Sequence, residues 1–150
     1  MTTLSASLRR VSAMALAAFL VTSVSAADIG QIKVSNGQVT VERKGESLPG
    51  RVGTRLESSD VLKTGPDGSV GITMSDNSLL SAGPNSILSL DRFDFDPTSN
   101  QGRFDAQLQK GSLAVISGRI AKQSPEAMTV RTPSAILGVR GTEFVVAAND

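Results

Sequence analysis

The residues of this chain that could do chemistry gather in two short stretches. In "DRFDFDP", alternating positions place Asp94 and Asp96 on one strand face and Phe93 and Phe95 on the other. Two carboxylates could hold Ca²⁺ or act as a hydrolase pair. However, the chain lacks the Asp-x-Asp-x-Asn-Gly loop of a specific calcium site, and neighbours on one face do not flank a cleft. A solvated strand face explains the pattern, and we expect no metal site and no catalytic residues.

The second stretch, "VRTPSAILGVRGTEFVV" (Val130–Val146), puts Pro, two Gly and an Arg–Glu pair inside an apolar run. Alternation places Ala135, Leu137 and Val139 on the core face, and unbroken alternation would then bury Glu143. One extra residue, a β-bulge at glycine 141, would reverse the phase. After the reversal, Thr142, Phe144 and Val146 would face the core, and Glu143 would face solvent.

The same stretch also allows a binding interpretation. Arg140 and the neighbouring backbone N–H groups could hold an anion, whereas the bulge interpretation makes Arg140 and Glu143 a flanking ion pair. We favour the bulge and treat the stretch as structural, with a possible role in interaction. The residues concerned are Pro133, Arg140, Gly141, Thr142 and Glu143.

Composition excludes several classes of function. The chain has no Cys and no His, so it lacks disulfides, the usual neutral-pH acid/base and the commonest transition-metal ligand. No base stands ready to activate a Ser, and the Gly-rich "TGPDGS" lacks the Lys-Ser/Thr of a phosphate loop. We therefore expect no enzyme and no cofactor. Without a basic run, we also expect no nucleic-acid partner.

The N-terminus predicts export. Residues 1–26 carry Arg9 and Arg10, then an apolar stretch, then "VSA" with small residues suited to signal-peptide cleavage. The apolar stretch is shorter than the roughly 20 residues that span a bilayer. We expect a cleaved signal peptide at 1–26, a mature domain at 27–150 and no stable membrane span after cleavage. The mature protein would be periplasmic or secreted, with 13 basic and 14 acidic residues once the two arginines are removed.

Short alternating runs separated by Gly, Pro, Asn and Asp predict the fold class. Turn pairs after Lys63 recur every eight to ten residues, and no mature segment shows a helical period. We expect a single all-β domain of short antiparallel strands, arranged as a β-sandwich or a short β-solenoid. The clearest runs are Gln38–Arg43, Ser69–Met74, Ser86–Phe93, Gly111–Ser117 and Met128–Arg131.

The motifs resemble a known family in their order along the chain. "TVRTPSAILGVRGTEFVV" resembles the signature that closes the FecR domain of bacterial exported proteins, after a "VG..L...D.L.TG" step and a "G..S.L.L..F" strand. The resemblance runs from Asp28 to Val146. It implies a non-catalytic all-β interaction or signalling module of the periplasm whose partner is another envelope protein. Only Met1–Leu8 precede the charged region, so we do not expect sigma-factor handling by this chain.

A structural or glycan-binding role in the cell envelope is the alternative, although glycan sites usually present exposed aromatic rings and the mature chain has few. The segment near Thr142–Ala147 carries a further expectation. Members of the family often continue beyond it, and its β-branched and aromatic residues contain no Lys or Pro. It should either lie inside the sheet by a non-sequential pairing or recruit a partner by strand addition or self-association.

Overall fold

Strands form where apolar residues alternate with polar ones, as predicted. In β6 (Ser69–Met74) every second residue, beginning with Val70, is buried. β2 (Val39–Arg43) buries Val39 and Val41 and leaves its other three residues partly exposed. A period of two gives a strand one face for the core and one for solvent, so the pattern sets both the strand and the side that it buries.

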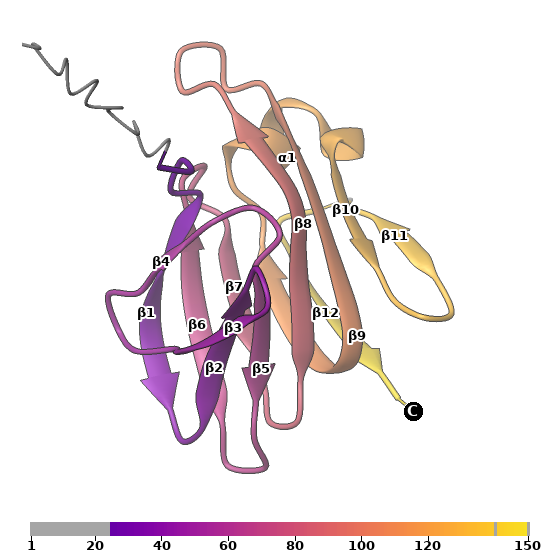
Figure 1. The fold of residues 1–150 in the computed structure, drawn as a ribbon. Coiled ribbons are helices and arrows are strands. Elements are labelled where there is room, and N and C mark those ends of the chain that lie inside the picture. The colour runs from indigo at the N-terminus through magenta and orange to yellow at the C-terminus, as the bar shows by residue number, and fades with distance from the viewer. Residues whose placement is uncertain (1–24, 140, 150) are drawn as a thin grey trace, which may run out of the picture.

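The computed structural model describes residues 25–139 and 141–149, which form one curled sheet of twelve strands (Figure 1). Two short helical segments, α1 (Arg119–Gln123) and the 3₁₀ turn η1 (Pro125–Ala127), interrupt it. The all-β single domain is confirmed. Within the described ranges, no helix is long and apolar enough to cross a membrane. The other strands are β1 (Gly30–Asn36), β3 (Glu46–Pro49), β4 (Arg55–Leu56), β5 (Val61–Thr64), β7 (Leu79–Ala82), β8 (Ile87–Phe95), β9 (Gly102–Ile116), β10 (Met128–Arg131), β11 (Ile136–Gly138) and β12 (Glu143–Ala148).

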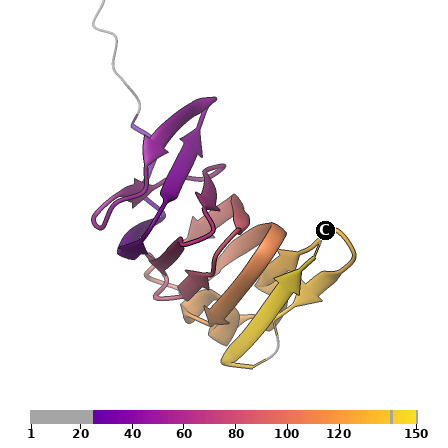
Figure 2. The ribbon, with the colours of Figure 1, turned by 90° about the horizontal axis from the view of Figure 1, so that it is seen from below.

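The sheet folds over so that two layers enclose one core, which corresponds to the sandwich alternative. One layer has the strand order β3-β2-β5-β8-β9-β10-β11 and the other has β4-β1-β6-β7-β9-β12. The buried apolar cluster draws side chains from both layers. Figure 2 shows that the N-terminal strands lie at one end of the molecule and β12 lies at the other.

β9 joins the two layers. Its first part pairs with β8 and β10, and its last part, from Gly111 to Ile116, pairs with β12 and in part with β7. Gly111 sits at the change of partners with φ +91°, and a Cβ there would meet Ser86 Oγ at 2.1 Å. The Ser86 hydroxyl in turn accepts a hydrogen bond from Ser112 N at 3.0 Å. Only glycine combines this φ with this close approach.

Two features of β9 differ from the prediction of short antiparallel strands. β9 has 15 residues, and β10 runs parallel to its first part, with Met128 opposite Phe104. A parallel neighbour requires the chain to return along the sheet, and the segment with α1 and η1 makes that return. The buried Asp76 carboxylate holds the segment by accepting hydrogen bonds from Ser78 N at 3.0 Å, Ser78 Oγ at 2.8 Å and Ile120 N at 3.2 Å.

Candidate functional site

Pro133 lies at the tip of the hairpin that joins β10 to β11. Thr132 N donates to Ala135 O at 2.8 Å, and Ala135 N donates to the Thr132 hydroxyl at 3.1 Å, so Pro133 occupies a closed, exposed turn. A fixed φ suits such a position. Pro133 precedes β11 and Gly141 follows it, so these two predicted site residues lie at opposite ends of this strand and do not form one cluster.

Gly141 lies in a corner between two strands, and the prediction of a bulge within one strand is wrong. β11 pairs with β10 in one layer, whereas β12 pairs with β9 in the other, so the chain changes layers between them. Gly141 has φ +111°, and its carbonyl accepts a hydrogen bond from the buried Ser117 hydroxyl at 3.0 Å. Ser117 N donates to Thr142 O at 2.8 Å. A change of layer reverses the phase as a bulge would, and alternation alone does not separate the two.

The predicted phase after the corner holds, with one exception. Val146 is buried, Phe144 is half-buried against the core and Glu143 is exposed, as predicted. Thr142 is exposed, although the phase argument placed it inside, because it still belongs to the corner.

The core face predicted before the corner is largely wrong. Ala135 and Leu137 are exposed and only Val139 is buried. Arg140 lies outside the described residues, and so does its predicted ion pair with Glu143.

An apolar groove runs along the open end of the sandwich between β11 and β12. One hollow, of about 550 Å³, is lined by Pro125, Glu126, Gly138, Val139 and Gly141. A second, of about 270 Å³, is lined by Leu137, Gly138, Phe144, Val145 and Val146. Both include Gly138, and we call them together the end groove.

Two exposed aliphatic side chains belong to the strands that line the end groove, namely Ile136 of β11, next to the lining residue Leu137, and Val145 of β12, which is itself a lining residue. Ile136 is 73% exposed and Val145 is 72% exposed. Among the described lining residues, Glu126 is the one ionisable side chain, and no hydroxyl or imidazole is present. Such a surface can bind an apolar segment of another protein, but its described lining residues supply neither a nucleophile nor an acid/base pair.

The paired aspartates have structural partners. Asp94 accepts a 2.6 Å hydrogen bond from Arg92 Nε on the exposed face of β8. Asp96 accepts hydrogen bonds from Thr98 N at 2.9 Å and Ser99 Oγ at 3.0 Å, which close the loop to β9. The backbone bond from Thr98, followed by the hydroxyl bond, lowers the pKa of Asp96. The two carboxylates serve different neighbours, so their spacing reflects strand alternation.

Asp105 ties β9 to β10 at the base of the hairpin. Its carboxylate accepts hydrogen bonds from Thr129 Oγ1 at 2.5 Å and Arg103 Nε at 3.0 Å. Burial raises the pKa of this carboxyl, but the bonds from Arg103 and Thr129 outweigh burial, and the pKa is lowered. The ionised carboxylate therefore helps to hold the hairpin against the rest of the sheet.

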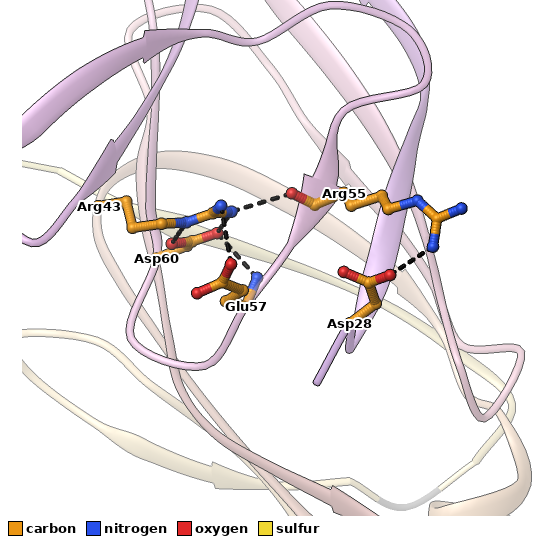
Figure 3. A network of polar contacts seen from close by, with 5 residues as sticks. All are labelled: Asp28, Arg43, Arg55, Glu57 and Asp60. Carbon is orange, nitrogen blue, oxygen red and sulfur yellow. Dashed lines mark hydrogen bonds and ion pairs between the residues drawn. The ribbon is translucent and has the colours of Figure 1, made fainter. Parts of the chain in front are cut away.

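A network of five polar side chains lies at the N-terminal end of the described sheet (Figure 3). Arg43 Nε and Nη2 donate to the Asp60 carboxylate at 2.9 and 2.6 Å, and Nη1 pairs with Glu57 at 2.9 Å. Nη2 also donates to the carbonyl of Arg55, whose own guanidinium pairs with Asp28 at 2.5 Å. The hydrogen bond to Asp60 raises the pKa of Arg43.

This network clamps β2, β4 and the loop before β5 together. The Asp60 side chain is only 1% exposed, so its charge is satisfied internally and is not offered to a ligand. Asp60 is the aspartate of the family-like "VG..L...D.L.TG" step. It is not among the site residues predicted from the sequence, and nothing in the local pattern around Arg43 indicates the pairing. The two residues meet through the β2–β5 register, which a local sequence pattern does not reveal.

One family model matches the sequence of this chain. The family model described as FecR protein matches residues 60–150, more than half of the chain. No curated protein and no solved structure matches. The match begins at β5, although β1 and β2 pair directly with β6 and β5 and share the same core. Because this match covers more than half of the chain, the chain belongs to the FecR family.

Proposed function

We propose that this chain is an exported, non-catalytic module that binds another protein of the cell envelope through its end groove. The FecR family takes part in the regulation of signal transduction, and its members interact with other envelope and regulatory proteins. The observation that carries the proposal is the exposed apolar end groove. Its walls come from β11, β12 and the corner between them, which belong to the segment that closes the family signature, and from η1.

Export to the periplasm is part of the same proposal. It rests on the N-terminal pattern, which lies almost entirely outside the described residues, and on the family's usual association with the membrane or periplasm. Mass spectrometry of the protein from fractionated cells should find a mature N-terminus at Ala27 or Asp28. An intact Met1 end in the membrane pellet would contradict export.

Site-specific photo-crosslinking tests the recognition surface. A photoreactive amino acid at Ile136, next to the groove-lining Leu137, should form a defined adduct with an envelope protein in intact cells. Val52, which is 64% exposed and lies before β4, is the matched control. Leu137→Asp, which charges the groove wall on an exposed strand, should remove the adduct without lowering the unfolding midpoint. An equal adduct from both probes, or none from Ile136, would overturn the proposal.

The glycan-binding alternative has no observation in its favour. Phe93 and Phe104 are buried and stack edge-to-face with ring centroids 5.3 Å apart. Phe95 and Phe144 pack against the core. Within the described ranges, these four rings form no exposed platform for a sugar.

A further inference from the structure

The outer edge of β12 is unpaired within the part of the chain that the structure describes. β12 pairs with β9 on one side, and no other described strand adjoins it. Ser117 N bonds to Thr142 O, so every second residue from Thr142 onward turns its backbone toward β9. The intervening residues, Glu143, Val145 and Ala147, therefore direct their N–H and C=O groups outward.

Nothing in β12 protects this edge. Natural sheet edges are blunted by Lys, Pro, bulges or a covering segment, and β12 reads "EFVVAA" in regular register with β9. Its most exposed large apolar side chain is Val145, and its one charge is Glu143. Among the described strands, β12 pairs non-sequentially with β9 on one side alone, so the segment lies at the border of the sheet and not in its interior. Recruitment of a partner at this border stays a prediction.

We propose that β12 binds a second copy of this chain, with the two β12 strands antiparallel about a two-fold axis at Val145. Outward residues of the two strands lie opposite one another only when the axis passes through a residue and not between two residues. Centring on Val145 uses all three outward residues of β12, because Glu143 then faces the partner's Ala147 and Val145 faces the partner's Val145. This contact between copies goes beyond the capture of another envelope protein proposed above.

Charge and shape both favour this register. The two Glu143 side chains lie four residues apart along the seam, so like charges do not face each other directly. On the inner face, Phe144 lies opposite the partner's Val146. An axis perpendicular to the sheet keeps both inner faces on the same side, so the two end grooves meet at the seam.

Cysteine crosslinking tests the register, because the chain has no Cys of its own. Opposed residues in a hydrogen-bonded antiparallel pair have Cα atoms about 5.5 Å apart, within disulfide range. Val145→Cys should therefore give a covalent dimer on mild oxidation. Glu143→Cys is the matched control on the same face. The two introduced thiols at position 143 would lie about 14 Å apart, the length of four strand residues. This variant should therefore form no covalent dimer. The double variant Glu143→Cys/Ala147→Cys should crosslink again.

Val145→Pro tests the edge itself. The Val145 N–H points away from β9, so proline removes the outward donor without breaking the bond ladder to β9. Light scattering across a concentration series should show the parent doubling in mass, while Val145→Pro stays monomeric with an unchanged melt. A parent that is monomeric throughout, or crosslinking that is equal at Glu143 and Val145, would overturn the dimer. Failure of the dimer would not decide the proposed function, which the Ile136 photo-crosslink tests separately.

Discussion

Replacing Arg43 with alanine should destabilise the protein more than any change at a surface ion pair. The substitution removes both guanidinium bonds to Asp60, at 2.9 and 2.6 Å, and leaves a carboxylate that is 1% exposed. That carboxylate would keep only the bond from Glu57 N, at 2.8 Å. An abandoned buried charge costs roughly 3–5 kcal/mol. The guanidinium side of the pair is 23% exposed and partly screened, so we expect a loss of about 3 kcal/mol.

Equilibrium unfolding in urea measures this loss. With a slope of about 2 kcal/mol per molar, 3 kcal/mol lowers the midpoint by about 1.5 M. Arg92→Ala is the matched control, because it breaks an ion pair whose two side chains are each 62% exposed. It should cost less than about 1 kcal/mol.

A double variant separates the buried charge from lost packing. Arg43→Met combined with Asp60→Leu removes both charges and keeps apolar volume, so it should recover most of the stability lost in Arg43→Ala. The explanation fails if Arg43→Ala and Arg92→Ala unfold at the same urea concentration. It also fails if the double variant is less stable than Arg43→Ala, because the cost would then lie in packing.

Three further substitutions test other features of the structure. Asp105→Asn should reduce the fall in unfolding free energy that occurs as the pH becomes acidic. The pKa of Asp105 is lowered in the folded state, so the carboxylate stabilises the fold above about pH 4 and loses this effect as the pH falls through the lowered value. Unfolding free energies measured at several pH values test this. Asp76→Ala should cost about 2–4 kcal/mol in a urea melt, because the buried N–H groups of Ser78 and Ile120 lose their acceptor. Gly141→Ala should cost about 1–3 kcal/mol, because an L residue is strained at φ +111°.

The glycine prediction has a close internal control. Gly138 and Gly141 both have open space where a Cβ would stand, but only Gly141 has a positive φ. Gly138→Ala should therefore change stability by less than about 0.5 kcal/mol. Equal losses at the two positions would show that backbone conformation is not the cause. For Asp105, an unchanged fall in unfolding free energy at acidic pH in the asparagine variant would contradict the role of its hydrogen bonds.

Local alternation was enough to predict several strands. β6 and β10 occupy the predicted ranges Ser69–Met74 and Met128–Arg131, and β2 differs from its prediction by one residue. In each of these strands, apolar residues on one face alternate with polar or small residues on the other. The same rule placed Asp94 and Asp96 on an exposed face, which the structure confirms.

The arrangement of strands was harder to predict, because it depends on contacts between distant segments. The first part of β9 alternates Phe104, Ala106 and Leu108 with polar residues, but strongly polar neighbours obscured this strand. Its parallel pairing with β10 needs the crossover through α1, which has no helical period of its own. At Gly141, one phase reversal fits either a bulge or a change of layer, and only the pairing partners decide between them.

The position of β9 has a consequence for how the protein folds. Its hydrogen-bonding partners come from segments on both sides of it in the chain, from β7 at Leu79–Ala82 to β12 at Glu143–Ala148. Neither layer can be completed until β9 is in place, and β9 cannot serve both layers until the backbone turns at Gly111. Chains dominated by such long-range pairings fold on the millisecond-to-second timescale, because loop closure comes before the contacts that reward it. We therefore expect one slow, concerted refolding phase, with Gly111→Ala slowing refolding because the turn at β9 limits its rate.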